Sequence, residues 1–430
     1  MPERTAISIL GQQLNANGTA RTGPIPHPFS VEAPGTDERA PVRSLYVHVP
    51  FCFHKCHYCD FYSIVDTRDR QAAFLDRLER ELAAMAPLSR RAPLRTIFVG
   101  GGTPSLLRVD LWERLLATLN RLFDLRDIRA GEGEFTVECN PETVSPELMA
   151  TLRKGGVDRV SIGAQSFNPQ HLKTLERWHE PANVRRAVQL ASDAGIVRQS
   201  VDLIFGIPGQ TLAEWHRDLE IAIGLGTEHI SCYNLTYEAN TAMTARLKRG
   251  EFVPADEDLE VDMYEATLST LRAAGLDRYE ISNYARPGAE AKHNLAYWRQ
   301  EQWFAAGPSA SGHIGGYRWK NSPRLDDYLS MDDHGWARVV DLETPDPRRA
   351  LAERLMTGCR LREGLPSGEA IARAATLDPA AAARLAKVWD SFASEGLIRS
   401  DSGERWCLND AGMLVADSLA GRLMDALDPR

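Results

Sequence analysis

From Leu45 onward, short apolar runs alternate with longer amphipathic stretches, and this alternation restricts the possible folds more than any other feature. Such a pattern is typical of repeated βα units around a parallel sheet. We expect six strands, at 45–50, 96–100, 135–139, 159–163, 200–205 and 229–235. Six units form either an open doubly wound sheet or a partial barrel, and the pattern alone does not decide between them.

The stretches around these runs carry apolar residues at helical spacing. One example is the segment after the second predicted strand, which places four leucines on one helical face: Leu111, Leu115, Leu119 and Leu122. The segment after the fifth predicted strand begins with Thr211-Leu-Ala-Glu214, which is a capping box. Helices are likewise predicted at 70–85, 145–154 and 256–276.

Three cysteines, Cys52, Cys56 and Cys59, follow the first predicted strand at CxxxCxxC spacing. One short loop can therefore direct three thiols at a single point at little entropic cost. Thiolates suit zinc or iron–sulfur clusters. Zinc would need a fourth protein ligand, and three nearby histidines are candidates: His48, His54 and His57. Iron–sulfur clusters usually take four cysteines, so three would leave one iron open to a small molecule.

The residues around this loop resemble a known superfamily. Tyr46-Val-His-Val-Pro-Phe-Cys52, the cysteine spacing and the following Asp60-Phe61 are similar to radical SAM proteins of the coproporphyrinogen oxidase-like branch. The resemblance implies a partial (β/α)6 barrel and a [4Fe–4S] cluster on the three cysteines, Cys52, Cys56 and Cys59. It also implies that S-adenosylmethionine binds the open iron. A structural zinc loop is the alternative.

Polar and glycine residues stand at the ends of several predicted strands, where parallel α/β folds gather their ligands. Taken singly, each is more often a turn, a strand-end cap or a surface charge. A cationic sulfonium joined to a zwitterionic amino acid and a ribose needs carboxylates, an amide and a guanidinium in one cleft. Matched in order to the superfamily's pattern, the implied S-adenosylmethionine ligands are Tyr46, Gly101, Gly102, Thr103, Glu138, Gln165, Arg177 and Asp202.

A second motif lies beyond the six predicted units, in Lys292-His-Asn-Leu-Ala-Tyr-Trp298. Read without a resemblance, it indicates a packed aromatic core with one satisfied histidine. It is similar, however, to the HNxxYW signature of the HemW-type heme chaperones. Because neutral imidazole is a common axial ligand of heme iron, His293 is the predicted heme ligand. Four other histidines stay open as alternatives: His48, His54, His57 and His313.

Phe61 bears on the choice between two activities. The related oxygen-independent coproporphyrinogen III oxidases carry CxxxCxxCxC, and Phe61 stands at the position of the last cysteine. This departure speaks against oxidase activity. The resemblance therefore implies a chaperone that binds heme and transfers it to an acceptor protein, which the sequence does not identify. The alternative function is oxidative decarboxylation of coproporphyrinogen III, so enzyme activity itself stays open.

Four regions are predicted along the chain. Residues 1–43 are rich in proline, glycine and small polar residues, and we expect a flexible extension. Residues 44–240 form the radical SAM core, and 241–344 extend the barrel and carry the HNxxYW segment. Residues 345–430 read as helices followed by a hairpin at 397–408, which predicts a small, mainly helical, winged-helix-like domain.

Charge and cysteine usage restrict the partners and the compartment. The formal net charge is −9, and the segment from Ile371 to Arg430 holds seven basic against nine acidic residues, so a nucleic-acid partner is not expected. The four cysteines outside the loop are scattered, which favours a reducing compartment. The chain starts without the features of a signal peptide, and no later run is long enough to span a bilayer. The sequence therefore predicts a cytoplasmic protein without an integral membrane segment.

Overall fold

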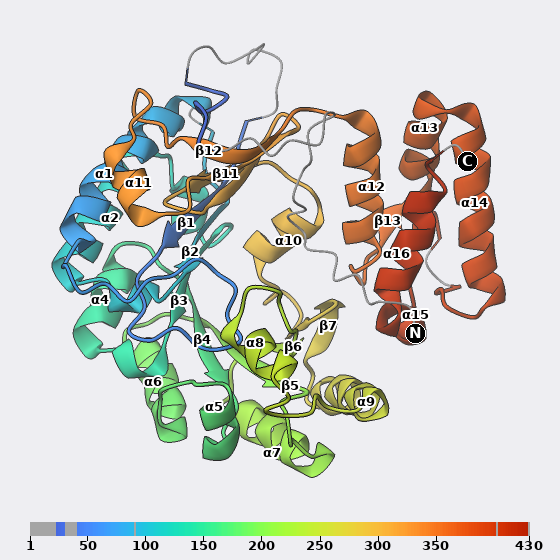
Figure 1. Ribbon diagram of the computed structural model, residues 1–430, viewed down its shortest axis with the longest axis horizontal. Coiled ribbons are helices and arrows are strands. Elements are labelled where there is room, and N and C mark those ends of the chain that lie inside the picture. Colours follow the sequence, from blue (N-terminus) through green and yellow to red (C-terminus); the bar gives the residue numbers. More distant parts are fainter. Residues whose placement is uncertain (1–22, 31–40, 90–91, 401–402, 429–430) are drawn as a thin grey trace.

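The computed structural model describes residues 23–30, 41–89, 92–400 and 403–428. Six parallel strands lie side by side in chain order and form the curved centre of the molecule (Figure 1). They are β1 (Ser44–Val49), β2 (Thr96–Gly101), β3 (Glu134–Cys139), β4 (Arg159–Gln165), β5 (Arg198–Phe205) and β6 (His229–Asn234). All six lie where the apolar runs predicted them, so the parallel α/β core is confirmed.

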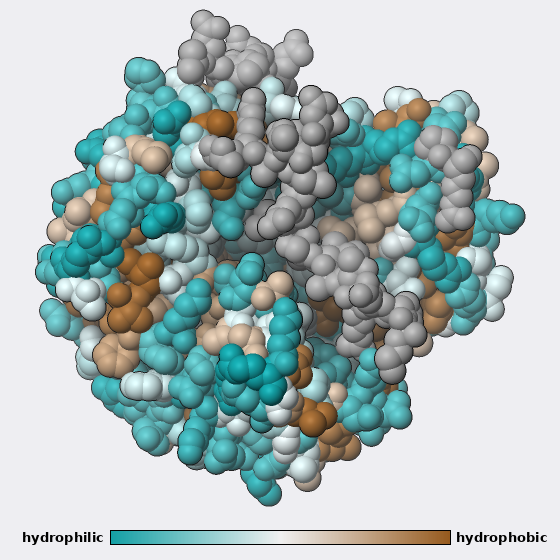
Figure 2. All heavy atoms as spheres, in the orientation of Figure 1, coloured by the Kyte–Doolittle hydropathy of each residue, from teal (hydrophilic) through white to brown (hydrophobic). Residues whose placement is uncertain are grey.

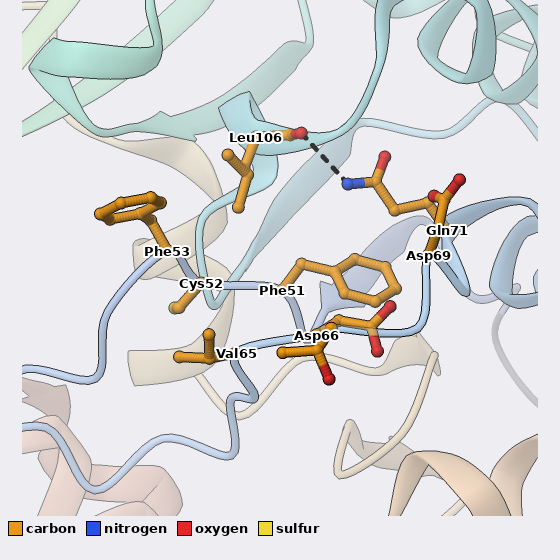
Figure 3. Close-up of a pocket in the computed structure, with 9 residues that line it drawn as sticks. Phe51, Cys52, Phe53, Val65, Asp66, Asp69, Gln71 and Leu106 are labelled. Carbon is orange, nitrogen blue, oxygen red and sulfur yellow. Dashed lines mark hydrogen bonds between the residues drawn. The ribbon is translucent and has the colours of Figure 1, made fainter.

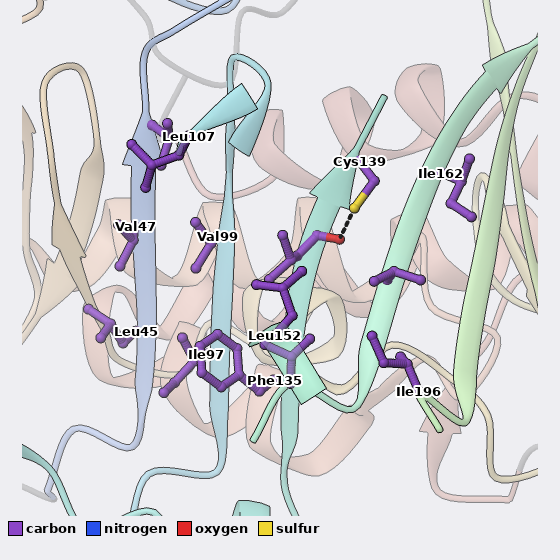
Figure 4. Packing of buried hydrophobic residues seen from close by; sticks show 14 of the residues in the cluster. Leu45, Val47, Ile97, Val99, Leu107, Phe135, Cys139, Leu152, Ile162 and Ile196 are labelled. Carbon is purple, nitrogen blue, oxygen red and sulfur yellow. Dashed lines mark hydrogen bonds between the residues drawn. The ribbon is translucent and has the colours of Figure 1, made fainter. Parts of the chain in front are cut away.

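Helices cover the outer face of these strands. They are α1 (Gln71–Met85), α2 (Val109–Leu122), α3 (Arg126–Arg129), α4 (Pro146–Lys154), α5 (Pro169–Thr174), α6 (Pro181–Asp193), α7 (Leu212–Ile223) and α9 (Glu257–Ala273). Leu45, Val47, Ile97, Val99 and Phe135 fill the space between strands and helices and are fully buried (Figure 4). Removing a leucine of this kind costs about 2–5 kcal/mol of stability, so this layer fixes the strands that hold the site.

Side chains that cap helix ends explain several boundaries. Ser145 accepts a hydrogen bond from the Leu148 amide at the start of α4. Thr211 and Glu214 form the predicted capping box of α7. Asp256 caps α9 by accepting from the Asp258 amide. Shorter helical turns lie in the connections: 3-10 turns at Ala86–Ser89, Pro104–Leu106 and Pro141–Thr143, α8 (Ala242–Lys248) and α11 (Leu325–Ser330).

The sheet continues on both sides of the six parallel strands and has twelve strands within the described part of the chain. Beyond β6 lie β8 (Asn283–Ala285) and β7 (Asp277–Glu280), both antiparallel to their neighbours. On the other side, β9 (Trp303–Ala306) pairs in parallel with β1. The antiparallel strands β10 (Ser311–Ile314), β11 (Tyr317–Asn321) and β12 (Val339–Glu343) follow it. Strand β1, which leads into the cysteine loop, therefore lies inside the sheet.

Part of the predicted flexible extension is packed against this outer sheet. Ile25 pairs with Val339 of β12 through two backbone hydrogen bonds of 2.8 and 2.9 Å. His27 stacks on Trp336 with ring centroids 4.1 Å apart and meets Trp319 edge-on at 4.8 Å. The structure differs from the prediction at residues 23–30 because aromatic contacts and strand pairing fix them. The rest of the predicted extension up to residue 40, namely 1–22 and 31–40, lies outside the described residues.

The C-terminal region is mainly helical and has a hydrophobic core of its own. Its elements are α12 (Pro347–Gly358), β13 (Leu365–Pro366), α13 (Ser367–Leu377), α14 (Pro379–Ser394), β14 (Arg405–Trp406), α15 (Asp410–Leu414) and α16 (Ala416–Asp425). Ile398 bridges Leu408 in antiparallel fashion, as the predicted hairpin requires, although residues 401–402 at its turn lie outside the described part. Figure 1 shows these helices beside the barrel.

The outer surface gives little sign of a large apolar face on the side that Figure 2 shows. There, hydrophobic residues form small separate groups among hydrophilic ones. None of the helices in the described ranges combines the length and the apolar character needed to cross a membrane.

Candidate cofactor site

A cavity of about 1250 Å³ opens at the carboxyl ends of the parallel strands. It brings together all the residues predicted as cluster or cofactor ligands except Tyr46 and His293. The predicted residues that line it are Cys52, Cys56, Cys59, Gly101, Gly102, Thr103, Glu138, Gln165, Arg177 and Asp202. Parallel strands present their carboxyl ends at one edge, which is why positions more than 100 residues apart meet here.

The cysteine loop is closed at its base by backbone pairing. The Cys52 amide donates to the Ile64 carbonyl at 2.9 Å, and the Ile64 amide donates to the Pro50 carbonyl at 2.8 Å. Within the loop, the Cys59 amide donates to the Cys56 carbonyl at 3.2 Å and forms a tight turn. The three thiols are half-buried. The loop therefore keeps them at the cavity wall without hiding them.

Two side chains from other elements contact the thiols. The Thr103 hydroxyl donates to the Cys52 sulfur at 3.5 Å. The Arg177 guanidinium donates from Nη1 to the Cys56 sulfur at 3.8 Å. Burial raises the pKa of the Cys52 thiol, and it raises the pKa of Cys59 to about 12. Deprotonating these thiols would therefore require a positive ligand such as a metal cluster.

A single metal ion and a cluster place different demands on the three thiols. A tetrahedral zinc with bonds of about 2.3 Å to sulfur would bring its thiolates to about 3.8 Å from one another. Within the described residues, no three or more Cys, His, Asp or Glu side chains are gathered in this way. A four-iron cluster takes each cysteine on a different iron. Three thiolates can hold three of the four irons, so the donor set fits such a cluster.

The glycine segment after β2 approaches β1 more closely than a side chain would allow. Gly101 has a φ of 106°, and a Cβ there would lie 2.4 Å from the His48 ring. The Gly102 and Thr103 amides donate to the Val49 and Phe51 carbonyls at 2.8 and 2.7 Å. These amides therefore anchor the cysteine loop, and they are already engaged.

Two carboxylates lie on the cavity wall close enough to influence each other. Burial, together with the neighbouring Asp202 carboxylate, raises the pKa of Glu138 to about 7. The Gly101 amide donates to Glu138 at 3.0 Å. Asp202 accepts hydrogen bonds from the Ser161 hydroxyl at 2.9 Å and the Ser231 hydroxyl at 2.7 Å. A wall with two half-buried acids suits a ligand that carries positive charge.

Arg177 and Gln165 lie at the end of β4. The ladder between β4 and β5 is irregular at this end, and Gln165 adopts a φ of 63°, a conformation that non-glycine residues rarely take. Arg177 donates from Nη2 to the Gly163 carbonyl at 3.0 Å. Its Nε is buried and has no hydrogen-bond partner among the described residues. That free donor suits a ligand with a carboxylate.

Tyr46 does not line the cavity. Its hydroxyl lies 3.0 Å from Nδ1 of His48, and its ring stacks with Phe98 at 6.2 Å. Glu138 is close enough to Tyr46 to add to the effect of burial, and together they raise the Tyr46 pKa. Tyr46 thus stands behind the carboxylate wall on β1.

His293 lies away from the cavity and is fully buried at the start of α10 (Lys292–Trp298). Nδ1 is 2.8 Å from the Thr96 hydroxyl, and Nε2 is 2.8 Å from the Tyr297 hydroxyl. Burial lowers its pKa to about 4, so the ring is neutral at pH 7. Both ring nitrogens are occupied, and the surroundings do not support the prediction that His293 ligates heme iron. Its environment is that of a core histidine whose two ring nitrogens are both hydrogen-bonded.

The other candidate histidines differ in how their ring nitrogens are used. His48 is occupied at both nitrogens, by Tyr46 and by the Tyr62 carbonyl at 2.8 Å. Nδ1 of His57 lies 3.2 Å from Arg246, and Nδ1 of His313 lies 3.2 Å from the Glu301 carbonyl. Nε2 of His54 is buried without a hydrogen-bond partner in the described part of the chain.

Some residues of the site were not predicted from the sequence. Ser161 and Ser231 donate hydrogen bonds to Asp202. The sequence feature that could have pointed to them is the presence of polar residues within β4, β5 and β6, which are otherwise apolar strands. Phe53 and Trp178 line the cavity although 68% and 58% exposed, respectively. Nothing in the sequence distinguishes these aromatic residues from buried ones.

Comparisons with known proteins agree with this geometry. The radical SAM superfamily matches residues 46–222. The chain is 37% identical to the heme chaperone HemW of Mycobacterium tuberculosis, over 88% of this chain and 94% of the relative. It is 33% identical to the heme chaperone HemW of Escherichia coli, over 89% of this chain and 98% of the relative. The solved structure of the radical SAM enzyme coproporphyrinogen III oxidase (HemN) from Escherichia coli has the same fold: its TM-score is 0.76 at 22% identity, with 90% of this chain and 92% of that chain covered.

Proposed function

The chain belongs to the HemW family of the radical SAM superfamily, and from this premise we propose that it is a heme chaperone. In this proposal it binds heme and transfers it to an acceptor protein. A [4Fe–4S] cluster is held by Cys52, Cys56 and Cys59, and S-adenosylmethionine binds beside it and exchanges with solvent.

The observation that carries the proposal is the convergence of three thiols, two half-buried carboxylates and an arginine on one cavity, the arginine with a donor that has no partner among the described residues. When bound, the cluster supplies an open iron for the amino and carboxylate groups of S-adenosylmethionine. Arg177 Nε donates to the ligand's carboxylate, and the negative charges of Glu138 and Asp202 attract the positive sulfonium. Thr103 keeps the Cys52 sulfur oriented through its hydroxyl.

Oxidation of coproporphyrinogen III is the second candidate function. It shares the cofactor cavity, and the fold similarity to the oxidase is compatible with it. Phe61 argues against it, because a 61% exposed aromatic ring stands where those oxidases carry their fourth cysteine. The chaperone is therefore the preferred function.

One experiment on a single sample separates the two functions. The full chain is reconstituted anaerobically with iron and sulfide, titrated with heme under an absorbance spectrum, and assayed for turnover of coproporphyrinogen III. We expect stoichiometric heme uptake without turnover. Turnover without stable heme binding would establish the oxidase, and a protein with an intact cluster that takes up no heme would refute the chaperone.

A further inference from the structure

Exposed hydrophobic side chains are concentrated at one place on the molecule. Five of the nine large ones that are exposed among the described residues line the cofactor cavity or the smaller hollow beside it. They are Phe53, Phe61, Val65, Trp178 and Tyr233. Figure 3 shows Phe53 and Val65 beside Cys52 in the smaller hollow. Apolar groups gathered in the open at the mouth of a cavity indicate a binding surface.

The rings at this mouth are ordered relative to one another. We call Phe53, His54, Phe61 and Trp178 the aromatic rim. The His54 ring stacks on Trp178 with centroids 4.7 Å apart and planes 17° apart. Phe53 lies 6.3 Å from Trp178 at a tilt of 58°. Residues from the cysteine loop and from the segment after α5 thus form one aromatic surface.

We propose that heme docks on the aromatic rim, with His54 as the axial ligand of its iron. The proposal rests on the proposed function, since it assigns a place to the heme of the chaperone. A porphyrin is flat and apolar on both faces, and exposed aromatic rings that become covered supply most of the affinity for such a ligand. Heme bound on the rim would also bury apolar side chains that are exposed to solvent in the apoprotein.

The availability of ring nitrogens favours His54 over two of the other candidate histidines, His48 and His293. His48 and His293 already use both nitrogens. Nε2 of His54 is buried and has no hydrogen-bond partner among the described residues, and the Glu176 carboxylate beside it is 3.8 Å away, too far for a hydrogen bond. Because Nε2 is buried and the ring stacks on Trp178, ligation of the iron requires the imidazole to turn out of this stack.

The remaining chemistry of heme also finds partners here. Its two propionates need cations, and Lys55 and Lys173 both line the cavity. The cavity of about 1250 Å³ is larger than the roughly 300–1000 Å³ usual for a small-molecule site, so it has room for more than one ligand. The rim lies at the mouth, while the acids that suit S-adenosylmethionine lie deeper on the strands.

Removing rim side chains tests the location. Trp178→Ala, Phe53→Ala and the double variant of the reconstituted full chain are titrated with heme and followed by the Soret band. Val253→Ala and Val197→Ala are the matched controls, because these residues are 82% and 71% exposed and line neither hollow. We expect Trp178→Ala to raise the heme dissociation constant about tenfold, the double variant to raise it further, and the controls to match the wild type.

Cluster content and S-adenosylmethionine affinity are measured on the same variants, so that a general loss of structure is recognised. Wild-type heme affinity in Trp178→Ala and Phe53→Ala would overturn the proposed location of heme and would not affect the proposed chaperone function. Unchanged heme affinity with failed delivery to an acceptor would likewise overturn it, because the rim would then be a protein-docking surface. A wild-type chain that takes up no heme refutes the proposed function itself.

The axial ligand has its own test. His54→Ala should shift the Soret band and change the electron paramagnetic resonance signal of ferric heme. Added imidazole should restore the wild-type form of both. His57→Ala is the control on the same loop, and it should leave both signals unchanged. An unchanged spectrum in His54→Ala would overturn the ligand assignment.

Discussion

Glu138 illustrates, at the scale of single residues, how burial sets the charge of the cavity. Its pKa lies at about 7 because the carboxyl is desolvated and faces Asp202, while Arg177 and the Gly101 amide oppose the shift. A carboxylate with a raised pKa is half protonated near neutral pH, and its negative charge develops fully only above pH 7. The cavity therefore becomes more attractive to a cation as pH rises.

This predicts a pH dependence of cofactor binding. The affinity of the reconstituted protein for S-adenosylmethionine should rise between pH 6 and pH 8, because ionised Glu138 attracts the sulfonium. Glu138→Gln should bind more weakly at pH 8 and lose most of this rise. Isothermal titration at several pH values measures both. An equally steep rise in the variant would assign the dependence to another group.

The cysteine loop gives a second prediction at this scale. Cys56→Ala should lose the cluster, because two thiolates do not hold four irons securely, and iron and sulfide content should fall to near zero. The fold should persist, since the Cys56 sulfur contacts Arg177 rather than the hydrophobic core. Cys359→Ala, which removes a thiol buried in the C-terminal region, is the control and should keep full iron content.

At the scale of elements, helix α10 closes the amino ends of the parallel strands. The His293 amide donates to Glu134 on β3, and its ring meets Thr96 on β2. Glu134 also pairs with buried Arg159 at 2.9 Å. The HNxxYW segment thus lies at the opposite ends of the strands from the cysteine loop, where it joins neighbouring strands.

This placement predicts a structural effect for His293→Ala. The substitution removes two buried hydrogen bonds and leaves a cavity, so the free energy of unfolding should fall by about 3 kcal/mol. The heme spectrum of the folded variant should match that of the wild type. Denaturant unfolding and the Soret band are measured together, and an altered band at unchanged stability would restore His293 as a heme ligand.

Local signals made much of the fold predictable. The capping box at Thr211 and Glu214 and the apolar stripe of α2 depend on neighbours within a few residues, and both are confirmed. Helix α6 was not predicted, although its buried residues recur at helical spacing: Val184, Ala187, Val188 and Ala191. The parallel pairing of β9 with β1 was also not predictable, since no local pattern specifies a partner about 250 residues away.

The candidate site was predictable where chemistry is carried by residue type and order, as for the three cysteines, Glu138 and Asp202. The site was not predictable where the role of a residue depends on whether its side chain is exposed to solvent. Trp178 lies in the connection between α5 and α6 and is 58% exposed, whereas Trp215 lies in α7 and is fully buried. Only the packing of distant elements distinguishes a rim residue from a core residue.

At the scale of the whole molecule, the barrel and the C-terminal region have separate hydrophobic cores. Asp410 at the start of α15 forms ion pairs from the C-terminal region to the barrel region. It pairs with Arg278 at 2.8 Å and with Arg272 at 3.0 Å. The Arg278 side chain is 5% exposed, so its charge depends on this partner more than a surface arginine would.

Asp410→Asn should therefore loosen the C-terminal region selectively. Because Asp410 is half exposed, the cost should be about 1 kcal/mol rather than that of a fully buried pair. Amide hydrogen exchange should become faster across α12 to α16 and stay unchanged in β1–β6. Glu369→Gln, which breaks an exposed pair with Arg373 inside α13, is the control and should have almost no effect. Uniformly faster exchange would show that the two cores unfold together.

The position of β1 inside the sheet also has a consequence for synthesis on the ribosome. One neighbour, β2, emerges soon after β1, but the other, β9, follows only after about 250 further residues. At 5–20 residues per second this edge stays unpaired for about 13–50 s. During that interval the strand that leads into the cysteine loop presents a free edge. The nascent chain thus passes through a period in which strand β1 needs protection from pairing with other chains.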